Sequence, residues 1–427
     1  MSTLPTTTVD FVLAGLENFM IRTGQGAHRA VTVLKLRGQP HAAELEASWR
    51  RLHANQPMLG AKLRRRWRGW RLVWKTSGAV IAPPIIWHPP QEAAPSDEII
   101  RQRLCGQRDG EEWTAPLSME VFPCGEDHFI LLTWRHALLD GTGVNLLLER
   151  LAEGGGSTPP VLPNPKRESM KALYQRARPL TRRLHAMTCA GSLSAWSTGM
   201  PLHGKPCFRL IQLTAEETRA VAEHLRELCG DFMQMPFYAA VAARIVRHLH
   251  QLRGWQSPEL HLQIPFQPRG RPRDLIFGNH MGTLPLFLNA AAMTSPRAST
   301  AHVVEKYKES MMQGRAQATE AMMTLAAHMP ISRFVPMMRW TNQGQICSIF
   351  HSHTGVFLPT HRSFAGAEVQ DVYTIPGVCS PPGLGLFFSE CRGHLTATLS
   401  WREGGVSTQE VDALCHRLRC DLVGSAQ

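Results

Sequence analysis

The sequence predicts a mixed α/β protein built from two domains. In both halves of the chain, segments with the apolar periodicity of helices alternate with short apolar runs that are typical of strands. The length of 427 residues, 43% of them hydrophobic and 19% charged, is enough for two domains that each bury a core. A stretch rich in Gly and Pro, Glu153–Pro165, separates the halves. We therefore predict an N-terminal domain over residues 1–165 and a C-terminal domain over residues 166–427.

In the N-terminal half, the clearest elements lie on either side of a polar turn. The apolar run Phe129–Trp134 predicts a buried strand, and Gly143–Leu151 has the pattern of the helix that follows it. Upstream, basic and apolar residues alternate over 63–74, which predicts a hairpin with one exposed basic face. The strand fixes the position of the backbone, and the turn that follows it can direct polar side chains into a cleft.

The C-terminal half continues with a basic helix, a strand and further helices. Two of the helices open with capping boxes, Thr214 with Glu217 and Ser407 with Glu410. The predicted elements are a helix over 169–187, a strand over 208–213, and helices over 214–229, 235–252 and 407–422.

The polar turn itself reads Trp134-Arg135-His136-Ala137-Leu138-Leu139-Asp140-Gly141. A neutral imidazole at the end of a strand can take a proton from a hydroxyl or amine that attacks a thioester, because its ordinary pKa is near working pH. Asp140 can fold back to bind an arginine, and Gly141 removes a side chain where the backbone must turn. The alternative is a histidine that is satisfied in the core beside an N-capping aspartate.

Together with other segments, this turn makes the chain resemble the CoA-dependent acyltransferase superfamily. That superfamily includes chloramphenicol acetyltransferase, plant acyltransferases, wax ester synthases and the condensation domains of nonribosomal peptide synthetases, and its motif is His-His-x-x-x-Asp-Gly. The other similar segments are an opening strand, helix and Pro-x-Leu turn at 31–38, 42–53 and 56–63, a Pro…Arg…Gly-Asn segment at 263–282, and a late hairpin at 382–401. The resemblance covers nearly the whole chain. It implies two chloramphenicol-acetyltransferase-like lobes, each a mixed β-sheet flanked by helices, with an active-site tunnel between them.

The resemblance also implies roles for the residues of the turn. His136 matches the second histidine of the motif, which is held responsible for proton transfer in the family. Arg135 stands where condensation domains and wax ester synthases usually carry the first histidine. This departure places an extra cation near the donor or acceptor channel, so we expect Arg135 to contact substrate.

Three residues are predicted to support the site structurally. Arg269 matches the arginine of the family's second segment, and we expect it to pair with Asp140 and hold the His136 loop. Arg271 and Arg273 are competing partners. A buried carboxylate without such a partner would be costly, so Asp140 is assigned to the scaffold with Arg269, and Gly141 to the turn.

Asn279, His351 and His353 are predicted to contact substrate. Asn279 can orient a substrate carbonyl, or can merely occupy a turn that Gly-Asn favours. If 349–354 is a strand, His351 and His353 point to one face of it, as metal ligands can. No third ligand follows at a telling spacing, so we predict no metal. The family has a tunnel-lining strand at this point, which favours substrate contact.

The predicted activity is one-step acyl transfer. We find no Gly-x-Ser-x-Gly elbow, no Walker phosphate loop and no His-Glu-x-x-His helix in the sequence. The resemblance implies that an acyl thioester on phosphopantetheine, carried by an acyl or peptidyl carrier protein or by CoA, reacts with an amine or alcohol. His136 would be the general base, and no tightly bound cofactor is needed. The alternatives are a non-catalytic carrier-binding module, an isomerase or cyclase, and a wax ester or acylglycerol synthase-like O-acyltransferase.

The charge of the chain bears on its partners. The formal net charge is +12. This charge can attract an acidic carrier protein or the phosphates of coenzyme A, or it can simply form a solvated basic surface without a partner. The hairpin pattern at 63–74 argues against nucleic acid. The ten cysteines form no Cys-x-x-Cys pair, which predicts free thiols. No apolar run has the length of a transmembrane helix and the start lacks a secretory signal, so we expect a cytoplasmic protein.

Overall fold

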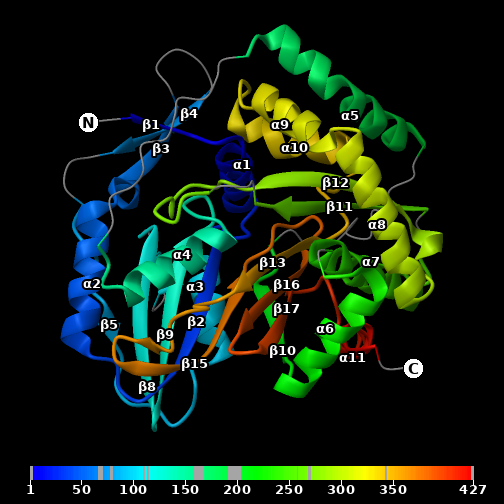
Figure 1. Cartoon of the computed structure of the whole chain (residues 1–427). Coiled ribbons are helices and arrows are strands. Elements are labelled where there is room, and N and C mark those ends of the chain that lie inside the picture. The colour runs from blue at the N-terminus through cyan, green and yellow to red at the C-terminus, as the bar shows by residue number, and fades with distance from the viewer. Residues whose placement is uncertain are drawn as a thin grey trace.

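The computed structural model describes most of the chain (Figure 1). The described residues are 3–65, 71–76, 80–108, 111–112, 115–156, 168–190, 203–231, 233–256, 258–267, 271–341 and 344–424. The strands and helices predicted above are present in them, with ends shifted by at most three residues. The chain is a mixed α/β protein, as predicted.

The N-terminal lobe is built on a six-stranded sheet with the order β14-β15-β2-β9-β8-β5. Its strands are β2 (Arg29–Arg37), β5 (Ile86–Trp87), β8 (Leu117–Cys124), β9 (Asp127–Arg135), β14 (Ser363–Phe364) and β15 (Ala367–Pro376). Apolar side chains alternate along β2 and β9, so each face of the sheet buries one set. One face packs on α2 (Ala42–Asn55) and α4 (Gly141–Ala152), and the other packs on α3 (Asp97–Cys105).

The C-terminal lobe combines a four-stranded sheet with a hairpin. The sheet has the order β10-β17-β16-β13, from β10 (Pro206–Gln212), β17 (His394–Arg402), β16 (Leu384–Cys391) and β13 (Phe350–Val356). The hairpin pairs β11 (Glu259–Phe266) with β12 (Gly282–Asn289). One core joins these strands to α6 (Ala215–Cys229), α7 (Gln234–Leu252), α8 (Pro296–Met312) and α11 (Thr408–Val423).

Part of the N-terminal sheet comes from the C-terminal part of the sequence, beyond the predicted domain boundary at residue 165. β15 belongs to the C-terminal part of the sequence, but it pairs antiparallel with β2 in the N-terminal sheet. Figure 1 shows the orange β15 beside the blue β2. β15 also contacts the other lobe, because Thr398 Oγ1 donates to the carbonyl of Thr374 at 3.0 Å.

A third group of elements packs around the N-terminal helix. It contains α1 (Thr8–Arg22), α9 (Arg315–Ala326), α10 (Ile331–Thr341) and a small sheet of β1 (Thr3–Pro5), β4 (Leu72–Thr76) and β3 (Ala61–Arg65). β3 and β4 form the predicted hairpin, in which Lys62 and Arg64 are exposed and Trp74 is buried. The remaining short elements are η1 (Pro57–Gly60), η2 (Ala290–Ala292), β6 (Gln107–Arg108) and β7 (Glu111–Glu112).

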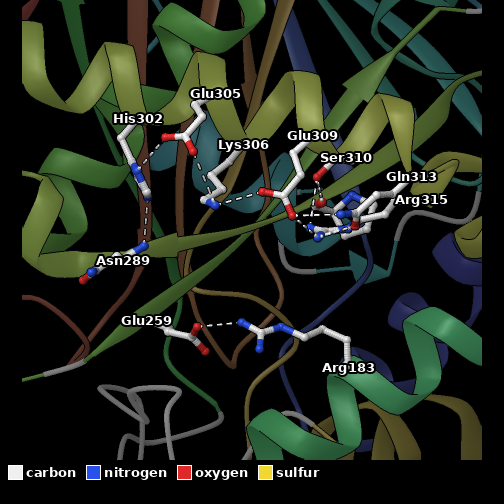
Figure 2. Close-up of polar contacts among 11 residues, drawn as sticks. Arg183, Glu259, Asn289, His302, Glu305, Lys306, Glu309, Ser310, Gln313 and Arg315 are labelled. Carbon is white, nitrogen blue, oxygen red and sulfur yellow. Dashed lines mark hydrogen bonds and ion pairs between the residues drawn. The ribbon is translucent and has the colours of Figure 1, made fainter.

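The predicted basic helix is α5 (Met170–Ala190), which packs on α9. Figure 2 shows Arg183 reaching Glu259, with an Nη2 to Oε1 distance of 2.7 Å. The same view shows a row of polar residues along α8 that ends where Glu309 pairs with Arg315, 3.0 Å apart. Part of the positive charge here is therefore neutralised by ion pairs within the chain.

None of the helices in the described ranges has the length and apolar character that crossing a bilayer requires.

Candidate functional site

The pairing of β2 with β9 brings two histidines together. The last residue pair of the ladder is Arg29 with Arg135. His28 and His136 lie opposite each other just beyond this pair, and the His136 N–H donates to the carbonyl of His28 at 2.9 Å. Residues that lie opposite each other on antiparallel strands share a face, so the two imidazoles meet. Their ring centroids are 4.9 Å apart, with an interplanar angle of 37°. Trp134, two residues before His136, lies edge-on to its ring at 5.4 Å.

The imidazole ring of His136 is mostly buried. Burial lowers its pKa, while backbone groups and the negative charges of Asp140 and Glu17 oppose that shift. Its Nδ1 has no hydrogen-bond partner among the described residues. An imidazole whose pKa lies below the ordinary value is neutral at neutral pH, so it is able to accept a proton.

Asp140 is fully buried, and both of its carboxylate oxygens accept hydrogen bonds. It caps α4, where its Oδ1 accepts from the Gly143 N–H at 2.7 Å, and its Oδ2 accepts from the His280 N–H at 2.8 Å. The Arg271 Nη1 lies 2.7 Å from Oδ1 and completes a buried ion pair. These contacts tie the His136 loop to the segment before β12, which is a scaffolding role.

The partner of Asp140 is therefore Arg271, one of the two competing arginines, while Arg269 lies outside the described residues. A short turn explains this choice, because the Arg271 Nε donates to the carbonyl of Leu275 at 2.9 Å and so points the guanidinium at the carboxylate. Arg273 instead reaches Glu149 at 2.8 Å on the surface of α4.

Gly141 serves packing, which corrects the predicted turn role. It is the first residue of α4 and does not adopt a positive φ. A Cβ at this position would lie 2.8 Å from the Cγ2 of Thr354. The glycine is needed because β13 approaches the start of α4 closely, not because the backbone turns sharply.

Arg135 forms a two-pronged ion pair with Glu17 of α1. The Nε to Oε1 distance is 3.0 Å and the Nη2 to Oε2 distance is 2.7 Å. The Glu17 side chain is 6% exposed and that of Arg135 is 40% exposed. Arg135 therefore anchors α1 to the end of β9, and only its outer surface is left for a substrate. That surface lines a pocket of about 290 Å³ together with Lys62 and Arg64.

Asn279 is 1% exposed and holds two loops together. Its backbone N–H and its Nδ2 both donate to Asp10 Oδ1 at 2.9 Å, and Nδ2 also donates to the carbonyl of Ala137 at 3.0 Å. These bonds join the His136 loop to the first turn of α1. Because the amide donors are committed, the predicted contact of Asn279 with a substrate carbonyl is not supported, and the structural alternative accounts for the residue.

His351 and His353 do share one face of β13, but that face packs under α7. The ring of His353 stacks on Tyr238 at 4.7 Å and 11°, and Tyr238 in turn contacts Phe388. The opposite face carries Thr354, which meets Gly141. The alternation of the strand therefore turns both histidines into the core of the C-terminal lobe, and the predicted substrate contact is not supported. In the described part of the chain, no three metal-ligating side chains gather at one place.

Sequence reasoning missed His28, Glu17 and Asp10. His28 precedes a strand, and only the register of β2 on β9 reveals that it lies opposite His136. Glu17 and Asp10 belong to α1, whose buried face contains both acids among apolar residues. Their partners are distant in the sequence, so no local pattern signals them.

Comparisons with known proteins show the fold. No family model and no curated protein matches the sequence. Solved structures do match over 99% of the chain and 96% of their own chains: the TRI3 trichothecene 15-O-acetyltransferase from Fusarium sporotrichioides, with a TM-score of 0.72 and 11% identity, and the first condensation domain of the calcium-dependent antibiotic synthetase, with 0.67 and 18%. The chain has the condensation-domain fold. This confirms the two-lobed architecture that the resemblance implied.

The condensation-domain fold does not decide the reaction. The epimerization domain from the third module of tyrocidine synthetase B shares it, with a TM-score of 0.59, 14% identity and coverage of 99% and 96% of the two chains. Acetyl transfer, condensation and epimerization are different reactions on one fold, so the residues of the site, not the fold, determine the activity.

Proposed function

We propose that the protein transfers an acyl group from a phosphopantetheine thioester to an amine or hydroxyl acceptor, in the cytoplasm and within natural-product biosynthesis. The donor is carried by an acyl or peptidyl carrier protein or by coenzyme A. The observation that carries the proposal is the His136 loop: a mostly buried imidazole, whose pKa is lowered by burial, stands at the end of β9, and the buried Asp140–Arg271 pair fixes its backbone. A positioned base in a protected site is what thioester aminolysis or alcoholysis requires.

In the proposed mechanism, His136 moves one proton. As the acceptor nitrogen or oxygen attacks the thioester carbonyl, the imidazole takes the acceptor proton. The carbon–sulfur bond then breaks, and the imidazolium returns this proton to the leaving thiolate. The products are an amide or ester and a free thiol. Burial around the ring excludes water, which would otherwise hydrolyse the thioester.

Asp140 takes no part in this proton transfer. Its two carboxylate oxygens already accept bonds from Arg271 and from the backbone N–H groups of Gly143 and His280. Its negative charge favours the imidazolium that forms on His136 during the reaction, and otherwise it supports the loop.

An arginine in place of the family's first histidine does not favour a non-catalytic, carrier-binding module, because the ion pair with buried Glu17 gives Arg135 a structural function of its own. A wax ester or acylglycerol synthase-like activity differs from the proposal only in the chain length and acceptor of the substrates.

The test is product analysis by mass spectrometry with a panel of acyl donors, each supplied on coenzyme A and on a carrier protein, with amine and alcohol acceptors. We expect product only when donor and acceptor are both present, and we expect His136→Ala to lose about a hundredfold or more in rate. The matched control is His53→Phe, because His53 is also a buried histidine packed on a tryptophan, with ring centroids 4.3 Å apart. Full activity of His136→Ala would overturn the assigned base.

A further inference from the structure

The second imidazole of the site lies against His136 in a fixed position. His28 is 5% exposed, and its Nδ1, like that of His136, has no hydrogen-bond partner among the described residues. The ladder between β2 and β9 sets the distance of 4.9 Å between the two ring centroids. A ring held at this distance beside the proposed base limits both the rotation of the His136 imidazole and the access of water to it.

The backbone on the N-terminal side of His28 is held by the other lobe. Arg402 of β17 is 2% exposed and donates from Nη1 to the carbonyl of Gln25 at 2.8 Å. The Gln25 side chain exchanges two hydrogen bonds with the backbone of Ser380, at 2.8 and 2.9 Å. His28 is therefore fixed from both lobes, and a ring fixed in this way can fix its neighbour.

We propose that His28 is a positioning residue of the reaction centre, whose ring fixes the orientation of the His136 imidazole and shields it from water, so that His136 meets the acceptor uncharged. This inference rests on the proposed function, in which His136 is the base. His28 acts only through His136 and transfers no proton itself.

The charges around the pair agree with this role. Glu17 of α1 and Asp140 at the start of α4 face His136, and Arg402 of β17 faces His28. Burial lowers the pKa of His28 well below its ordinary value, and a charge on His136 would lower it further. His28 therefore stays neutral at neutral pH and contributes a desolvating ring next to His136, not a competing charge.

The experiment measures the pKa of His136 by NMR titration in the full-length protein, together with kcat and KM. In His28→Ala, water reaches the His136 ring, so we expect its pKa to rise towards the ordinary value near 6.5. We also expect kcat to fall about tenfold or more with an unchanged KM for the donor, because the base is no longer oriented. His28→Phe restores a ring of similar size without nitrogen atoms, so it is expected to recover both the pKa and most of kcat.

Two controls keep the outcome decisive. His53→Phe changes a different buried histidine and is expected to leave the pKa of His136 where it is. If His28→Ala does not fold, His28→Asn opens the same space to water and takes its place. The proposal would be overturned if the pKa of His136 were unchanged in His28→Ala, or in His28→Asn where that variant replaces it. It would also be overturned if the His28→Phe protein were as defective as His28→Ala.

The titration also separates this inference from the proposed function. If His136→Ala kept full activity, the general-base assignment would fail, but the pKa of His136 would still report whether His28 shields it. If instead the pKa did not move while His136→Ala was inactive, only the role of His28 would fail.

Discussion

Two pairs of neighbouring, largely buried histidines in the described part of the chain differ in what surrounds them. His28 and His136 lie at the ends of two paired strands, in loops that ion pairs and backbone bonds hold in place. His351 and His353 lie within β13 and share one face of it, on which the His353 ring stacks on Tyr238 of α7. Burial lowers the pKa of all four residues.

Burial and a lowered pKa therefore do not by themselves mark a reaction centre. What sets the first pair apart is its place at strand ends, where side chains leave the regular packing of the sheet, and the charges of Asp140 and Glu17 that act on His136. No charge is among the causes that shift the pKa of His351 or His353, for which burial alone acts. The two pairs can be separated experimentally through these charges.

The largest effect is expected from breaking the ion pair behind His136. Arg271→Met leaves the fully buried carboxylate of Asp140 without its partner, whereas Arg273→Met removes an arginine whose side chain is 68% exposed. We expect the free energy of unfolding to fall by about 3–5 kcal/mol for the first variant, the usual cost of an uncompensated buried charge. For the second we expect a clearly smaller loss, because an ion pair whose arginine is exposed to water contributes little.

Denaturant unfolding and calorimetry of both variants measure this difference. Equal losses for Arg271→Met and Arg273→Met would show that the Asp140 pair does not hold the loop. A stable Arg271→Met protein with a specific rate defect would instead assign Asp140 to the chemistry.

The order of elements was accessible from the sequence because it depends on local signals. Apolar runs such as Phe129–Trp134, and capping boxes such as Thr214 with Glu217, act within a few residues, and the structure has each of them. The membership of β15 in the N-terminal sheet was not accessible, because it depends on pairing with a strand more than three hundred residues away. A division of the chain into two consecutive domains does not anticipate that a C-terminal strand joins the N-terminal sheet.

For the candidate site, the sequence placed His136 and Asp140 but not the contacts that define their roles. Asp140 was expected to bind an arginine, yet three arginines lie within five residues, and only the turn at Leu275 selects Arg271. The face of β13 to which His351 and His353 point depends on how the sheet packs on α7, and alternation alone cannot give that. The position of His28 opposite His136 could not be predicted, because it depends on the register between β2 and β9, which neither strand's own sequence determines.

The next effect concerns the second histidine pair and the stability of the fold in acid. Burial lowers the pKa of His351 to about 4, against an ordinary value near 6.5, so the unfolded chain binds the proton first as the pH falls. Stability is then lost between pH 6.5 and 4, by about 2 kcal/mol at pH 5 for this one residue.

His351→Leu removes the titrating group from an apolar site in which neither ring nitrogen has a partner among the described residues. We expect the difference in the free energy of unfolding between pH 7 and pH 5 to shrink by about 2 kcal/mol relative to the wild type. Ser352→Ala, on the opposite face of β13, is the matched control and is expected to keep the wild-type difference. An acid sensitivity that His351→Leu does not reduce would place the responsible group elsewhere.

The smallest effect on stability, but the sharpest contrast between the two pairs, is expected from Glu17→Gln. Glu17 raises the pKa of His136, so removal of its charge lowers that pKa further and moves the acid limb of the pH–rate profile to lower pH. Arg135 loses its ion-pair partner, but its side chain is 40% exposed and water solvates it, so the free energy of unfolding is expected to change by less than about 1 kcal/mol. Glu149→Gln, which frees Arg273 instead, is the control. NMR titration should then show that the pKa of His136 falls while that of His351 stays the same, because the charge of Glu17 acts on His136 and burial alone shifts the pKa of His351. A change in both pKa values, or in neither, would contradict this difference between the two pairs.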